Sequence, residues 1–455
     1  MFGQCPLESP TTMRKQLADG LILRSLSEGY ASDRERLPQF YADVNSEHDN
    51  ELGKERTRIL TRDLMQGHAT TTLEDIFVVV DPAQDDRIAS ATLLIPQTWR
   101  YENIPIAVGR PEMVGTLPPY CGRGLVRELF AVIHERSAAL GHQLQVITGI
   151  PYFYRQFGYA MAVDLGEQHA SIPLHAVADA KPDYKPAFTL REATTDDIPD
   201  LIQWYDTMAR ERLLTELRSA DEWRYEISGR NPDSGQCLTF LIITNAAGEG
   251  VGYVEVYTHL SARDKEVVSC TGYVVGEKAS YLETFDDVIR GIKQWAQAKY
   301  GFCPALLMFA AGIHEALDTL VDRTTGGVVR GPDYFWLLRV PEMIPFLRHI
   351  QPVLDRRLEG SGANRYTGEL KIGFYDLTGI RIQFERGRIT AIEPITGKDG
   401  YDISFPWHML WNVVFGHHSY DDLRAILPEV WANGKAAVLL DVLFPKQKSW
   451  LKGLM

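Results

Sequence analysis

Cysteine is scarce in this chain, with five cysteines in 455 residues that lie far apart in the sequence. No two of them have the spacing of a metal site or of a dithiol redox motif, and their odd number argues against a disulfide framework. We therefore expect no metal, and we expect a reducing compartment, the cytoplasm, as the location of the protein.

Long apolar runs and an excess of basic residues are also missing. The longest apolar runs, such as residues 305–311 and 436–440, are far shorter than the ~20 residues of a membrane-spanning helix. The first residues lack the basic and apolar regions of a secretory signal. A net charge of −13 opposes nucleic-acid binding and would attract cationic amines. From these absences we expect that the protein has neither a membrane nor a nucleic acid as its partner.

The length and the composition are those of a globular protein with several domains. At 455 residues the chain has room for about three domains of roughly 150 residues each. Hydrophobic residues at 45% and charged residues at 24% are ordinary values. Residues 177–186, which mix lysine, aspartate and proline, read as a linker. We predict domains over residues 1–187, 188–340 and 341–455.

Residues 114–127 are the most informative stretch of the first predicted domain. A β-branched strand end is followed by a Pro-Pro turn, a Gly-Arg-Gly loop and an amphipathic helix over residues 125–140 that ends before Gly141. Because glycine has no side chain, the amides of the loop and of the first helical turn can converge on one anion. The helix dipole and two arginines add positive potential. The predicted diphosphate cradle consists of Gly122, Arg123, Gly124, Leu125, Val126 and Arg127.

Two motifs in this region resemble a known family. The pattern Pro-x-Tyr-x-Gly-x-Gly-Leu begins at Pro118, and the pattern Tyr-x-x-Phe-Gly-Tyr begins at Tyr154, after a predicted strand at residues 143–148. Together they resemble motifs A and B of the GNAT superfamily of N-acetyltransferases. The likeness is closer to the Eis-like (enhanced intracellular survival) branch, in which two acetyltransferase folds precede a sterol-carrier-protein-like domain.

The resemblance implies a site for acetyl-CoA and roles for particular residues. The strand edge would pair with the pantetheine arm of the cofactor, and Gly149 and Ile150 would add contacts. Tyr154 would act as general acid, since a phenol can protonate a departing thiolate at neutral pH. The carboxylate of Met455 would be the general base. Cys121 departs from the family pattern, where arginine or glutamine is usual. The strand edge consists of Val114, Gly115 and Thr116.

Further elements lead to an α+β fold with mixed sheets. In the first domain we predict strands at residues 21–25, 77–81 and 88–96, and helices at 33–45 and 51–65, with Pro38 kinking or shortening the former. The second domain repeats the order of elements but has no glycine-rich loop before its helix at 284–300. We interpret it as a degenerate GNAT-like copy that is not catalytic.

The third domain is predicted to contain strands followed by helices and a closing strand at residues 436–443. A helix over residues 343–358 is expected to be interrupted by Pro345 and Pro352. Four aromatic residues are candidates for the lining of a lipid tunnel or for ordinary core: Trp407, Trp411, Phe415 and Trp431.

The function that these features favour is an acetyl-CoA-dependent N-acetyltransferase. We expect direct transfer in a ternary complex to a polyamine-like or aminoglycoside-like amine or to lysine. The family resemblance also implies a homo-oligomer, a hexamer in relatives. Two alternatives stay open at this point: an acyl-CoA-binding sensor with little catalytic activity, and a lipid-binding protein that acts through the C-terminal domain.

Overall fold

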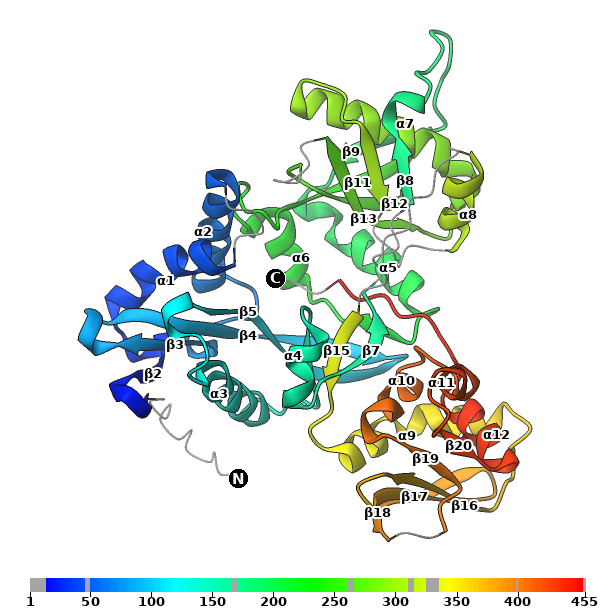
Figure 1. The fold of residues 1–455 in the computed structure, drawn as a ribbon. Helices are drawn as coiled ribbons and strands as arrows, with labels where there is room; N and C mark the ends of the chain where they lie inside the picture. Colours follow the sequence, from blue (N-terminus) through cyan, green and yellow to red (C-terminus); the bar gives the residue numbers. More distant parts are fainter. Residues whose placement is uncertain are drawn as a thin grey trace, which may run out of the picture.

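The computed structural model of the chain describes residues 14–45, 50–165, 170–260, 266–309, 315–324, 335–397 and 400–452. Three β-sheets covered by helices form the molecule (Figure 1). Each sheet combines antiparallel pairs with a parallel pair, which is β5–β6, β13–β14 or β16–β19. The predicted α+β class with mixed sheets is confirmed.

The first sheet has the strand order β1-β2-β3-β4-β5-β6-β15-β7, with β10 paired to β4. Its centre is the β4–β5 hairpin, and β3–β4 form the predicted hairpin before it. The strands are β1 (Arg14–Gln16), β2 (Ile22–Ser25), β3 (Ile76–Asp81), β4 (Arg87–Tyr101), β5 (Ile104–Thr116), β6 (Leu144–Ile147), β7 (Ala160–Asp164), β10 (Leu214–Glu216) and β15 (Phe335–Arg339).

Four helices belong to this sheet: α1 (Ala31–Val44), α2 (Glu51–Met65), α3 (Leu125–Ala139) and α4 (Pro151–Tyr154). Pro38 lies inside α1, which continues to Val44, so the predicted shortening is wrong, whereas the kink stays a prediction. Pro38 is the eighth residue of α1, so it removes one internal hydrogen bond, but the helix continues with Phe40 and Tyr41 buried. The predicted extents of α2 and α3 are confirmed within a residue.

The β5 strand separates from β6 toward its carboxyl end. The two strands pair only through Val108–Leu144 and Gly109–Gln145, and β6 pairs with β15 along its other edge. Opposite Ala91–Leu93, β5 contains a bulge at Met113, whose φ is +52°. A bulge bends a strand away from its neighbour. A gap therefore opens in the middle of the sheet beside residues 112–116.

The second sheet has the strand order β8-β14-β13-β12-β11-β9. The helix predicted at residues 284–300 is found as α7. The elements are β8 (Ala170–Pro173), β9 (Phe188–Glu192), α5 (Ile198–Ala209), α6 (Ala220–Arg224), β11 (Leu238–Asn245), β12 (Gly250–Tyr257), β13 (Val267–Val275), α7 (Tyr281–Tyr300), β14 (Leu306–Phe309) and α8 (Glu315–Thr324).

Several strands belong to a different sheet from the strands next to them in the sequence. The β8 strand precedes residue 187 but pairs with β14 of the second sheet. In the opposite direction, β10 pairs with β4, and β15 lies between β6 and β7 of the first sheet. The division at residues 187 and 340 stays a prediction about folding units, and these exchanged strands tie the units together.

The third sheet has the strand order β18-β17-β16-β19-β20 and is covered by helices. The α9 helix is continuous despite Pro345 and Pro352, so the predicted interruption is wrong. The elements are α9 (Met343–Glu359), β16 (Gly368–Phe374), β17 (Thr378–Glu385), β18 (Arg388–Thr396), β19 (Ile403–Phe405), α10 (Leu410–Val414), α11 (Tyr420–Ile426), β20 (Trp431–Ala432) and α12 (Gly434–Leu443).

The predicted closing strand at residues 436–443 is wrong, because this segment is α12. The side chain of Asn433 accepts a hydrogen bond from the amide of Ala436 and caps the helix. The buried residues are Ala436, Leu439, Leu440 and Leu443, which recur at helical spacing. A short apolar run does not by itself distinguish a strand from a buried helix. Here the Asn433 cap favours the helix.

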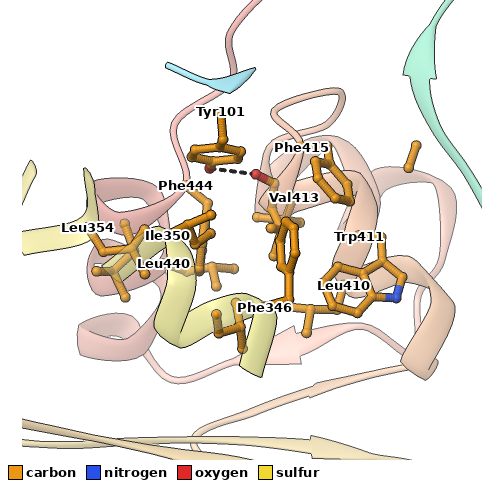
Figure 2. Packing of buried hydrophobic residues seen from close by; sticks show 14 of the residues in the cluster. Tyr101, Phe346, Ile350, Leu354, Leu410, Trp411, Val413, Phe415, Leu440 and Phe444 are labelled. Carbon is orange, nitrogen blue, oxygen red and sulfur yellow. Dashed lines mark hydrogen bonds between the residues drawn. The ribbon is translucent and has the colours of Figure 1, made fainter. Parts of the chain in front are cut away.

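Two of the four candidate tunnel aromatics are core residues, and two lie at the surface. Trp411 and Phe415 are buried against Phe346, with ring centroids 5.9 and 5.6 Å from the Phe346 ring (Figure 2). Trp407 and Trp431 are 40% and 46% exposed. The packing favours the interpretation as ordinary core over that of a lipid tunnel.

Replacement of Trp411 by alanine is expected to destabilise this core by about 3–5 kcal/mol, because it leaves a large cavity. Hydrogen exchange of the β16–β17 amides would measure the loss, and Trp407→Ala is the matched control because Trp407 is partly exposed. Equal effects of the two substitutions would contradict the assignment of Trp411 to the core.

Within the described segments, no helix combines the length and the apolar character that crossing a bilayer requires.

Candidate active site

The predicted phosphate loop lies between β5 and α3. The hydroxyl of Tyr120 donates a hydrogen bond to Asp81, with 2.7 Å between the oxygens, which ties the start of the loop to β3. Gly122 and Gly124 have φ values of +78° and +77°, and Gly124 is the N-cap of α3. Most L-residues are strained at such φ values, so the shape of the turn favours glycine at both positions.

The amides of this loop are available to an anion. Among the described residues, none accepts a hydrogen bond from the backbone amides of residues 122–126. Arg123 and Arg127 are exposed, and the guanidinium of Arg123 lies 5.1 Å from the centre of the Tyr120 ring. Free amides at a helix N-terminus next to two cations form an anion-binding arrangement.

The edge of β5 continues this arrangement into the gap of the sheet. Gly115 and Thr116 are held to β4, where the hydroxyl of Ser90 donates to the Gly115 carbonyl at 2.8 Å. A Cβ atom at Gly115 would lie 2.6 Å from Val44 and 2.7 Å from Asn45, so only glycine allows α1 to approach. This edge faces the gap because β6 has already turned away.

Tyr154 lies across the gap from the β5 edge. It is 9% exposed and belongs to a buried cluster with Phe130 of α3, Ile147, Tyr159 and Leu337. Val114 and Val126 pack against the same cluster. The structure thus brings together Tyr154, the strand edge and the first turn of α3, as the sequence predicted.

Gly149 supports the Tyr154 ring. Its φ is +120°, and a Cβ atom there would lie 3.0 Å from Cε2 of Tyr154. Ile150, the other predicted contact, is 67% exposed at the start of α4.

Gly149→Ala is therefore expected to displace the tyrosine ring and to cost about 1–3 kcal/mol through backbone strain. The melting temperature and kcat should both fall. A matched control is Gly434→Ala, since Gly434 has open space around its Cβ position. Unchanged kcat in Gly149→Ala would exclude this supporting contact.

The neighbouring aromatic residues have other environments. Tyr152 is exposed, whereas Tyr159 is buried and its hydroxyl lies 3.1 Å from Nε2 of His134. Burial raises the pKa of Tyr159, and burial together with Arg339 lowers the pKa of His134 to about 4. Both groups are therefore neutral at pH 7, and neither is poised to exchange a proton with solvent.

Sequence reasoning missed four polar residues on the α1 side of the gap. Arg110 and Glu112 of β5 form an ion pair of 2.7 Å next to the bulge. Burial and the charge of Glu112 raise the pKa of Tyr41. The side-chain amide of Asn45 donates to the Val114 carbonyl at 3.4 Å. They come from α1 and β5, so no local motif links them, although the Glu-Met-Val-Gly order around the bulge is a weak signal.

The predicted general base, Met455, lies outside the described residues. The chain is described up to Lys452, and Trp450 and Leu451 are buried. Within the described segments, no group of three or more His, Cys, Asp or Glu residues could hold a metal ion.

Part of the chain matches a known protein family. Residues 44–162 match a family model described as an acetyltransferase (GNAT) domain. This segment is a GNAT acetyltransferase domain. It contains α2, the β4–β5 hairpin, the glycine loop and Tyr154. The predictions of an N-acetyltransferase and of acetyl-CoA as its acyl donor are thereby confirmed.

Solved structures resemble almost the whole chain at low sequence identity. A GCN5-related N-acetyltransferase from Anabaena variabilis shares 13% identity with a TM-score of 0.65, over 95% of this chain and 99% of that chain. A GCN5-related N-acetyltransferase from Kribbella flavida shares 15% identity with a TM-score of 0.61, over 96% and 100%. Eis1 from Mycobacterium abscessus shares 14% identity with a TM-score of 0.56, over 94% and 99%. No curated protein matches the chain. At these identities the likeness establishes the fold alone.

Proposed function

We propose that the chain transfers the acetyl group of acetyl-CoA directly to a primary amine in a ternary complex. The observation that carries this proposal is the set of unpaired amides at residues 122–126, which open onto the same gap as Tyr154. The diphosphate of the donor would occupy the cradle of Gly122, Arg123, Gly124, Leu125, Val126 and Arg127. The pantetheine arm would pair with Val114, Gly115 and Thr116.

The second sheet offers a contrast that supports this assignment. The equivalent helix, α7, begins with a capping box in which the Ser280 hydroxyl accepts from the Glu283 amide, and Glu283 accepts from Ser280. The side chains of Ser280 and Glu283 thus satisfy polar groups that Gly124 leaves open at α3. We infer one catalytic unit, over residues 1–187, and a degenerate copy over residues 188–340.

A cationic amine must first lose one proton to solvent, because an ammonium nitrogen has no lone pair. The reaction of the neutral amine then requires two proton transfers. The amine nitrogen attacks the thioester carbon, and the carbon–nitrogen bond forms as the carbon–sulfur bond breaks. The α-carboxylate of Met455 would accept the proton of the amine, and the hydroxyl of Tyr154 would protonate the departing thiolate. The proton balance is then restored from solvent after CoA leaves.

The acceptor is proposed as a cationic amine, such as a polyamine-like or aminoglycoside-like molecule or a lysine side chain. The net charge of −13 favours such a substrate. We further propose an Eis-like organisation of the chain, with a sterol-carrier-like third domain over residues 341–455. We also propose that the protein is a homo-oligomer. A cytoplasmic location accompanies this proposal too, since the described cysteines are unpaired.

Calorimetry with acetyl-CoA followed by a thiol-release assay over a panel of amines tests the proposal. We expect binding of acetyl-CoA and amine-dependent release of CoA. Binding without turnover on any amine would favour the sensor alternative, and absence of acetyl-CoA binding would refute the proposed function.

A further inference from the structure

The C-terminal segment from Gln447 to Lys452, here called the strap, runs from the third sheet into the centre of the molecule (Figure 1). The Gln447 amide donates to the Gly416 carbonyl at 3.0 Å, and the Leu213 amide donates to the Lys448 carbonyl at 2.9 Å. Trp450 then pairs with β10 through Thr215. Chain ends usually fray, whereas this segment is bound along its length.

The end of the strap lies between the first and the second sheet. The Trp336 indole of β15 donates to the Leu451 carbonyl at 3.4 Å, and the Lys452 amide donates to Glu216 at 2.7 Å. Trp450 and Leu451 are buried. The strap therefore contacts the loop after α10, two strands of the first sheet (β10 and β15) and, through Lys452, the second sheet.

Lys452 ends in a buried group of charges on the second sheet. Its ammonium lies 2.6 Å from the carboxylate of Glu255 and 2.6 Å from the hydroxyl of Thr271. Glu255 is fully buried on β12, and Arg218 lies 3.6 Å from it while binding Glu216 at 2.8 Å. A buried carboxylate is costly unless it is paired, so Lys452 and Arg218 both stabilise the charge of Glu255.

A chain of contacts leads from the strap to the reaction centre. Trp336, which binds the Leu451 carbonyl, has the guanidinium of Arg110 4.9 Å from its ring centre. Arg110 pairs with Glu112, whose carboxylate accepts a hydrogen bond from the bulge amide of Met113.

From this geometry we propose that Glu255 is a positioning residue for acetyl transfer, because its buried pair with Lys452 holds the strap beside the β5 gap. This inference rests on the proposed function, in which the terminal carboxylate accepts the proton of the amine. Glu255 does not touch the substrate and acts only through the strap.

Glu255→Gln tests the inference because it leaves the sequence of the strap unchanged. In the full-length variant, kcat should fall about 10- to 100-fold, since misplacement of a catalytic group by ~1 Å has effects of that size. The dissociation constant for acetyl-CoA should stay within about twofold, because the phosphate cradle lies on another part of the chain. Lys446→Met is the matched control, since it removes an exposed partner of Asp422 next to the same segment.

Digestion with a carboxypeptidase gives a readout that is independent of activity. In the unaltered protein, trimming should not pass Lys452, whereas in Glu255→Gln it should pass Trp450. Lys452→Met should reduce kcat to the same extent, and the double variant should be no worse than either single one, because both remove one interaction.

Equal trimming of Glu255→Gln and the unaltered protein would show that Glu255 does not hold the strap. A released strap with unchanged kcat would show that the strap has no role in positioning the catalytic group. An unaltered protein that acetylates no amine would instead count against the proposed function, so the two failures are distinguishable.

Discussion

Tyr154→Phe is expected to lower kcat by about 100- to 1,000-fold, which is the usual effect of losing a general acid. The ring would remain in its buried cluster with Phe130 and Tyr159, so the fold and the acetyl-CoA site should be preserved. The dissociation constant for acetyl-CoA, measured by calorimetry, should therefore hardly change. Steady-state thiol release gives the kcat.

The matched control is Tyr152→Phe, which removes the hydroxyl of an exposed tyrosine two residues away. Its kcat should equal that of the unaltered protein. If Tyr154→Phe retained full turnover, the departing thiolate would have to obtain its proton elsewhere, and Tyr154 would be a packing residue only.

Gly124→Asp is expected to weaken acetyl-CoA binding at least about 100-fold, because a carboxylate would stand where the diphosphate needs positive potential. Gly124 has φ +77° and nothing within 4 Å of its Cβ position. Aspartate and asparagine tolerate this left-handed conformation better than other residues do. The variant should therefore fold, and calorimetry with acetyl-CoA measures the loss.

Gly124→Asn is the control for this substitution, since it has nearly the same shape without the charge. It should weaken binding much less than aspartate does, and added salt should narrow the difference between the two variants. Equal affinities of both variants at low salt would mean that the donor's phosphates bind elsewhere on the protein.

Local chemistry explains why the predictions around residues 113–159 agree with the structure. The strand end, the Pro-Pro turn, the left-handed glycines and the amphipathic α3 are each specified by neighbouring residues. Tyr154 could be linked to this loop only through the family resemblance, because thirty residues separate the two. Asn45 and Glu112 could not be found, since α1 reaches β5 only in the folded chain.

The wrong predictions have physical reasons of the same kind. An apolar run such as residues 436–443 is compatible with a buried strand and with a buried helix. The segment is a helix, which Asn433 caps and whose buried residues recur at helical spacing. Proline was expected to kink or shorten α1 and to interrupt α9, but both helices continue past their prolines with their apolar residues buried.

The sequence by itself determined the strand, glycine loop and helix that form an anion-binding turn, since each of these depends on residues close together in the chain. Only the tertiary structure decided that β15 enters the first sheet, that β8 leaves it, and that the strap ends on Glu255. Such pairings join residues more than a hundred positions apart. Their free energy comes from burial and from charge pairing, which no local pattern encodes.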